Sequence, residues 1–233
     1  MTGVAARAGA VAAVARVGAA AAVAKVGAVA GIAGPVVFTS AWIVSSLRQT
    51  GHPAADLQIS GLAAEDARDP WIMIAGFLVL GGCGVAFGAS LRERLVDRGR
   101  LGRCAGPAPG LIQAAGILTI AAGLLRRDHV LLTVGDVSWH NHAHDVVSAL
   151  IYADLVLAQA LLAARFGGDA TERGWRAWRP WLLASAGVTA ALLIAYAADT
   201  SGPLAGIVQR AAVTVPLAAM AAIAARLVRT PGG

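Results

Sequence analysis

Six long apolar runs constrain this chain more than any other feature of its sequence. A helix needs about 20 predominantly apolar residues to cross a hydrocarbon core of roughly 30 Å. Inside such a core, only helices and closed barrels satisfy their own backbone groups. The runs cover residues 26–47, 70–91, 110–125, 139–164, 181–198 and 203–227. We therefore predict an all-α, polytopic membrane bundle of about six transmembrane helices.

Composition supports a membrane class and argues against nucleic-acid binding. Charged residues make up 14% of the chain, against about 25% in a typical soluble domain. The net charge is +6, but the arginines fall in short loops between apolar runs and form no continuous basic face. We expect a multi-pass protein of the cell membrane whose partners are the lipid bilayer and a hydrophobic small molecule, with no nucleic acid. We expect no disulfide between Cys83 and Cys104, and two cysteines at this spacing do not form a metal site.

The distribution of basic residues predicts the orientation of the bundle. Fourteen Lys and Arg residues flank the runs on one side and five on the other, and basic residues are retained on the cytoplasmic side. Both termini should therefore be cytoplasmic. This topology places residues 48–69, 128–144 and 199–203 together on the outer face.

Residues 1–25 differ in pattern from the rest of the chain. A nine-residue quasi-repeat spaces Arg7, Arg16 and Lys25 evenly, so successive charges point to opposite sides of a helix. A signal peptide has one basic region before a short apolar core, whereas here charges interrupt the core. We interpret residues 1–25 as an Ala/Val-rich basic extension, with a signal peptide or an extra span as the alternative. Residues 26–229 form the predicted six-helix transmembrane domain.

The stretch 128–152 holds four of the five histidines and leads directly into an apolar run. Polar groups are costly beside hydrocarbon and often functional there. On a helix, His140 and His144 lie one turn apart on one face, which Ser148 and, deeper, Asp154 continue. A second pair of residues at the same spacing, Asn141 and Asp145, lies beside that face.

The histidine pair is open to three interpretations. Two histidines at this spacing can bind zinc if a carboxylate from another helix adds a third ligand. The glutamate of the HExxH motif is missing, because residues 141–143 read Asn-His-Ala. The histidines could instead hydrogen-bond at the interface, or serve acid/base or substrate-binding chemistry without a metal. We assign no metal ligand and no cofactor, with zinc as an open possibility.

Carboxylates and one arginine complete the candidate site. A carboxyl group buried beside apolar walls has a raised pKa and can act as a general acid, whereas a carboxylate in a loop is ordinarily solvated. Arg210 lies about two turns inside the last run, where an arginine snorkels, pairs with a buried carboxylate or binds an anionic group. The carboxylates expected at the outer face are Glu65, Asp66, Asp128, Asp136, Asp145 and Asp199.

The chain resembles a family of bacterial six-helix integral membrane proteins, widespread in actinobacteria and catalogued as a domain of unknown function. The resemblance covers about residues 31–226 and is carried by the order and spacing of four strings: ISGLAAEDARDPWIMIAGFLVLGG, GILTIAAGLLRRD, HNHAHDVVSAL and GIVQRAA. It implies the six-helix fold and no particular activity. More loosely, the chain is similar in size to small membrane-bound terpenoid cyclases, which also use acidic residues near span ends.

These observations favour an integral membrane enzyme that acts on a lipid- or isoprenoid-like substrate entering from the outer leaflet. Asp66, Asp145 or Asp199 would be the acid and His140 or His144 the base, as in a terpenoid cyclisation. Metal-assisted hydrolysis is one alternative. Another is a non-enzymatic transporter or accessory membrane protein, and the oligomeric state stays open. The predicted substrate-binding residues are Asn141, Ser148, Asp154 and Arg210.

Overall fold

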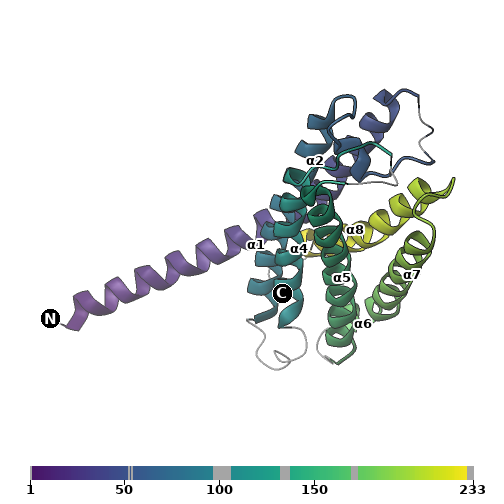
Figure 1. Cartoon of the computed structure of the whole chain (residues 1–233). Coiled ribbons are helices and arrows are strands. Elements are labelled where there is room, and N and C mark those ends of the chain that lie inside the picture. The colour runs from purple at the N-terminus through teal and green to yellow at the C-terminus, as the bar shows by residue number, and fades with distance from the viewer. Residues whose placement is uncertain are drawn as a thin grey trace.

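The computed structural model describes residues 2–51, 53, 55–96, 106–131, 137–168 and 173–229, and it is helical throughout these segments apart from their connections. This confirms the predicted all-α class. Cys104 and Asp136 lie outside the described residues, as do Arg98, Arg100 and Arg103, which contributed to the predicted orientation. The elements are α1 (Thr2–Arg48), η1 (Ser60–Ala63), α2 (Pro70–Val96), α4 (Pro107–Leu124), α5 (Trp139–Gly168), α6 (Arg173–Arg176), α7 (Trp178–Ala198) and α8 (Ala205–Arg229) (Figure 1).

Six helices in the described part of the chain are long and apolar enough to cross a membrane. Their spans agree with the predicted runs to within a few residues, except that the fifth begins at Gly174, seven residues early, because α6 leads directly into α7. The chain is therefore a multi-pass membrane protein. The spans are Ala22–Arg48, Pro70–Arg94, Pro107–Leu124, Trp139–Phe166, Gly174–Ala198 and Ala205–Arg229.

Helix α1 includes the N-terminal quasi-repeat. It runs without a break from Thr2 to Arg48, with Pro35 inside it. Its first part extends away from the other helices (Figure 1). No helix end marks residue 25, so the division between extension and transmembrane domain stays a prediction.

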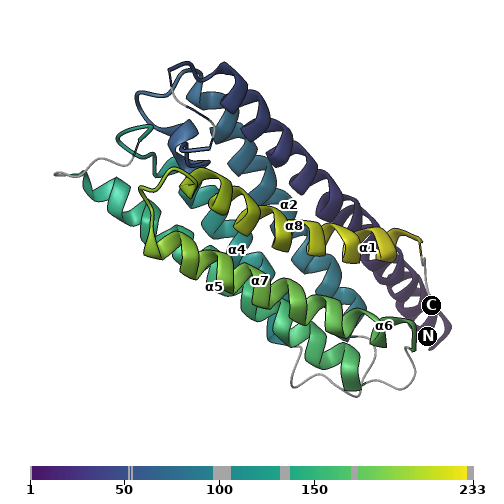
Figure 2. The ribbon, with the colours of Figure 1, turned by 90° about the vertical axis from the view of Figure 1, so that its right-hand side faces the viewer.

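The six spanning helices form a ring. Each one packs against the spanning helices before and after it in the chain, and α8 packs against α1 to close the circle. The first part of α1 and the end of α8 lie toward one end of the bundle in Figure 2, as an even number of spans requires. We call the opposite end, which carries the described residues of the connections 49–69 and 125–138, the outer end. Which end faces the cytoplasm stays a prediction.

Glycines allow the closest contacts within the ring. A side chain at Gly27 in α1 would collide with the backbone of Ala86 in α2, and one at Gly81 in α2 would collide with the backbone of Gly116 in α4. Small residues at such contacts let membrane helices approach closely, where van der Waals packing drives their association.

Two apolar clusters close the ring, one at each end. The cluster at the inner end includes Phe87, Leu162 and Ile223, from α2, α5 and α8. The cluster at the outer end is built mainly from α1, α2 and the connection that contains η1, and it includes Phe38, Leu57 and Phe77. The helices α5 and α7 contribute nothing to this second cluster. The outer parts of α5 and α7 therefore lie outside the apolar core of the bundle.

Candidate functional site

A buried segment closes the outer end of the ring. Residues 57–64, which we call the plug, include the single turn η1, and all eight are buried. A side chain at Gly61 would collide with the carbonyl of Val130, so the plug fits tightly beneath the connection between α4 and α5. The plug therefore forms the outer wall of whatever space the ring encloses.

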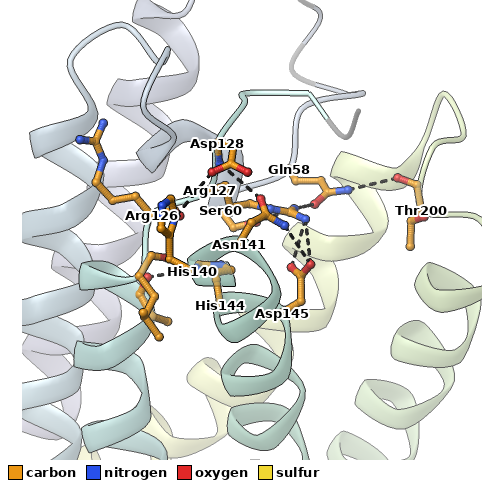
Figure 3. Close-up of polar contacts among 12 residues, drawn as sticks. Gln58, Ser60, Arg126, Arg127, Asp128, His140, Asn141, His144, Asp145 and Thr200 are labelled. Atoms are coloured by element: carbon orange, nitrogen blue, oxygen red, sulfur yellow. Dashed lines mark hydrogen bonds and ion pairs between the residues drawn. The ribbon is translucent and has the colours of Figure 1, made fainter. Parts of the chain in front are cut away.

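Arg127, in the connection between α4 and α5, holds the plug in place. Its guanidinium Nη1 donates to Gln58 Oε1 at 2.5 Å and to Ser60 Oγ at 3.4 Å. Its Nη2 forms an ion pair with Asp145 Oδ1 at 3.0 Å. Gln58 Nε2 in turn donates to the carbonyl of Thr200, in the turn between α7 and α8, at 3.1 Å. Figure 3 shows this network, in which one buried cation joins the plug, α5 and the last outer turn.

A second network fixes the start of α5. Asp128 accepts hydrogen bonds from the hydroxyl of Ser138 at 2.6 Å and from the backbone N–H of Ser138 at 2.7 Å. These two donors hold the pKa of Asp128 below its ordinary value, with a smaller contribution from the nearby His140. His140 Nδ1 lies 2.8 Å from Ser138 Oγ and 3.1 Å from the carbonyl of Arg126. His140 thus belongs to the cap of α5.

His144 lies one turn further along α5 and is buried, with 2% of its surface exposed. Its Nδ1 is 2.7 Å from the carbonyl of Leu125 and 2.9 Å from that of Ala122. Two carbonyl oxygens can only accept, so Nδ1 must carry the proton. These contacts satisfy carbonyls that the end of α4 leaves without helical partners. In the neutral ring, Nε2 is then a free acceptor.

His144 lines a cavity of about 110 Å³ between the two apolar clusters. The wall is largely apolar and is formed by α1, α2, α4, α5, α8 and the plug. For comparison, an apolar cavity of about 150 Å³ accepts benzene. None of the described residues that line the cavity is charged. The polar side chains in its wall belong to Ser60, Thr119, His144, Ser148, Tyr152 and Gln209.

The side of the bundle next to the cavity is loosely packed near the outer end. No residue of α5 from 145 to 157 is buried, and none of α7 from 190 to 198 is buried. The buried residues of α7, Leu182, Ser185, Ala186 and Thr189, all lie before residue 190. Residues 145–157 of α5 and 190–198 of α7 therefore form a loosely packed part of the ring wall.

The predicted site residues are divided between the cavity and its surroundings. His144 and Ser148 line the cavity. Asp145 is about half exposed (49% of its side chain) and is paired with Arg127, while Asn141 Nδ2 donates to it at 3.3 Å. Asp66 is also about half exposed and lies 3.2 Å from His129 Nδ1. Asp199 is exposed at the end of α7, beside Gly202. None of these three carboxylates lines the cavity.

Arg210 lies at the contact between α8, α1 and the plug. Its Nη1 donates to the carbonyls of Leu57 at 2.6 Å and Gly206 at 2.9 Å, and its Nη2 donates to Ser46 Oγ at 2.9 Å. The guanidinium also lies 5.3 Å from the ring centre of Trp42. Arg210 and the partly exposed Asp154 are absent from the cavity wall. The structure therefore does not bring His144, Asp145 and Arg210 into one shared pocket.

The described residues offer no ready metal centre. No group of three or more His, Cys, Asp or Glu side chains converges within them. The Nδ1 atoms of His140 and His144 both contact backbone carbonyls. Zinc binding by this pair stays a prediction. It would have to use the Nε2 atoms of the two histidines, together with further ligands that do not converge on them within the described residues.

Sequence reasoning missed the three side chains that organise the outer end. Arg127 is one of the five basic residues predicted on the outer side. An arginine directly after a span, on the side where basic residues are rare, itself indicates a specific role. Gln58 lies in the segment 48–69, which the sequence places on the outer face, and it connects Arg127 to Thr200. Gln209 Oε1 accepts from the backbone N–H of Ile59 at 2.6 Å, so its amide joins α8 to the plug.

Comparisons with known proteins place the chain in a family. Neither the search of curated proteins nor the search of solved structures gave a match. The looser resemblance to terpenoid cyclases therefore stays a prediction. Residues 32–226, which make up most of the chain, match a family profile. Of the six spans, the match leaves out only the start of the first and the last three residues of the sixth. The chain belongs to the family described as "Protein of unknown function (DUF998)".

Proposed function

We propose that this membrane protein binds a small hydrophobic, lipid- or isoprenoid-like molecule in the cavity at the centre of its ring. The observation that carries the proposal is the cavity itself, which is largely apolar, uncharged and about 110 Å³ in volume. Ligand sites are typically apolar hollows with a few well-placed polar groups, and His144 with Gln209 supplies such groups here. The resting volume suits a short chain or one end of a longer molecule.

The proposed route of entry is sideways, between the outer halves of α5 and α7. Residues 145–157 of α5 and 190–198 of α7 include no buried residue, so separating these two segments costs little apolar contact. A hydrophobic molecule already dissolved in the outer leaflet would reach the cavity without crossing water. Access from the water phase is hindered by the plug and by Arg127, which ties it down.

Photolabelling tests the proposal. The full chain in lipid nanodiscs would be irradiated with an octanol that carries a diazirine, and the labelled residues would be mapped by mass spectrometry. We expect label on cavity residues of α5 and α8, such as Leu155 and Met220. Ser148→Leu fills part of the cavity and should reduce this labelling several-fold. The matched change at the next residue, Ala149→Leu, is on an exposed position and should leave it unchanged. Label confined to outward-facing residues would contradict the proposal.

A second candidate function is proton transfer on the bound molecule, with His144 as the base. It is favoured by one feature: the backbone carbonyls of Ala122 and Leu125 fix the proton on Nδ1, so the lone pair of Nε2 is left available. The molecule that co-purifies with the protein would be incubated with it in deuterated buffer. Deuterium incorporated at carbon by the wild type but not by His144→Gln would support proton transfer. If neither protein incorporates deuterium, proton transfer is contradicted and only the binding function keeps its support.

The other mechanisms have less support. Cyclisation begins with a proton donor inside the cavity, and Asp66, Asp145 and Asp199 all lie outside it. Metal-assisted hydrolysis needs a third ligand that the described residues do not bring to the histidine pair. A relay through Asp145, Asp154 and Arg210 would need these side chains to communicate, and Asp145 and Arg210 bind different parts of the outer end.

A further inference from the structure

The polar groups that face the cavity point to a specific kind of ligand head group. Among the described residues no hydrogen-bond partner faces Nε2 of His144, although its Nδ1 is fully engaged by two carbonyls. This nitrogen has a lone pair and no proton, so it can accept one hydrogen bond and donate none.

Gln209 supplies the complementary group. Its Oε1 accepts from the backbone N–H of Ile59 at 2.6 Å, which fixes the orientation of the amide. The remaining polar atom of the Gln209 side chain, Nε2, is then the amine, which can only donate. In the described part of the chain this amine has no partner, and its residue lines the cavity. Beside the hydroxyl-bearing residues Ser60, Thr119, Ser148 and Tyr152, the cavity wall thus offers one nitrogen acceptor from α5 and one amide donor from α8.

The charges around the cavity are already used elsewhere. Arg127 lies behind the plug, and it is engaged by Gln58, Ser60 and Asp145. No Asp, Glu, Lys or Arg belongs to the described wall. A charged head group would lose its hydration there and gain no counter-ion, which is far more costly than burying a neutral hydroxyl with hydrogen-bond partners.

From these three observations we propose that the cavity selects a neutral hydroxyl compound, an aliphatic or isoprenoid alcohol, whose O–H donates to His144 Nε2 and whose oxygen accepts from Gln209 Nε2. The tail then lies toward Phe87, Ile112 and Met220, which also line the cavity. This inference rests on the proposed binding function and adds the chemical class of the ligand.

Displacement of the diazirine photolabel by simple eight-carbon probes tests the inference with the unaltered protein. The probes are n-octanol, its isomer heptyl methyl ether, octyl phosphate and octylammonium, each titrated and compared by its concentration in the membrane. The ether accepts a hydrogen bond but cannot donate one, so His144 Nε2 would stay unpaired. An unpaired buried group costs about 1–3 kcal/mol, so octanol should displace the label at about one tenth of the ether concentration or less. The two charged probes should not displace it from the cavity.

The outcomes separate the inference from the function on which it rests. Equal displacement by octanol and the ether would overturn the donor requirement, and displacement by octyl phosphate as effective as that by octanol would overturn the neutral head group. In both cases, cavity labelling that Ser148→Leu reduces would leave the proposed binding function standing. If the cavity takes up no label at all, the proposed function itself is contradicted.

Discussion

Arg127 and Asp145 form an ion pair whose two partners have very different environments. The arginine side chain is 6% exposed and the aspartate side chain is 49% exposed, with Nη2 and Oδ1 3.0 Å apart. The buried cation therefore depends on a carboxylate that water still reaches. Because Arg127 also holds the plug through Gln58 and Ser60, the pair connects the closure of the cavity to the position of α5.

Removing Asp145 should destabilise the protein more than removing an aspartate without such a partner. Asp145→Ala leaves a buried guanidinium with fewer partners, and we expect a loss of about 1–3 kcal/mol, less than for a fully buried pair because water screens this carboxylate. Asp199→Ala is the matched control at an exposed position of the same end and should cost no more than about 0.5 kcal/mol. Thermal unfolding of both variants in detergent measures the difference. Equal melting temperatures would contradict the importance of the pair.

Asp128 should make stability depend on pH in the acidic range. Its folded-state pKa is below the ordinary value because Ser138 donates two hydrogen bonds to it. A lowered folded pKa means that the ionised group stabilises the fold above its unfolded pKa, about 3.9, and that this stability is lost as the pH falls through the folded value. Asp128→Asn should therefore be less stable than wild type above about pH 5, and the gap should shrink below about pH 4. Melting temperatures of both proteins from pH 3 to 7 test this. A constant gap would show that Asp128 does not titrate in this way.

The spans could be read from the sequence because their signal is local. Each run needs only enough consecutive apolar residues, so the starts at Pro70 and Trp139 were placed correctly from composition alone. The fifth candidate span begins seven residues before the predicted run, because Trp175, Arg176 and Trp178 continue a nearly unbroken helix.

The cavity could not be predicted in the same way because it depends on how the ring closes. His144 and Ser148 were placed on one face of α5 correctly, and both line the cavity. Asp145 directly follows His144 in the chain. Helical periodicity cannot show that the side chain of Asp145 turns outward and pairs with Arg127, in the connection between α4 and α5. Nor can it show that the guanidinium of Arg210 donates hydrogen bonds to the carbonyls of Leu57 and Gly206. These contacts join residues up to 153 positions apart.

Cys83 is a native reporter of the cavity. It lines the cavity wall and is partly exposed. In Cys104→Ser protein, which leaves one thiol, a small neutral maleimide should label Cys83, whereas a sulfonated maleimide should not, because the uncharged cavity gives its anion no counter-charge. Mass spectrometry of the folded protein, with detergent-denatured protein as the control in which both reagents react, provides the measurement. Equal labelling by the two reagents would contradict an uncharged, apolar cavity.

The tautomer of His144 is a direct test of the site geometry. We expect the proton on Nδ1, because this atom faces the carbonyls of Ala122 and Leu125. Nitrogen NMR of protein labelled in its histidines distinguishes the two tautomers, and His144→Gln assigns the signal. A proton found on Nε2 would remove the free acceptor and with it the basis for both proton transfer and recognition of a hydroxyl group.

The orientation of the bundle decides which leaflet supplies the ligand. Fourteen of nineteen basic residues flank the spans on the side that holds both termini, and such residues are retained in the cytoplasm. A green fluorescent protein fused to the C-terminus should therefore fluoresce in bacterial cells, and alkaline phosphatase fused there should be inactive, since the first reporter folds only in the cytoplasm and the second only outside it. A phosphatase fused within residues 49–56, truncating the chain after the first span, should be active. The reverse pattern would place Arg127, the plug and the loose wall of α5 and α7 on the cytoplasmic side, and the ligand would then enter from the inner leaflet.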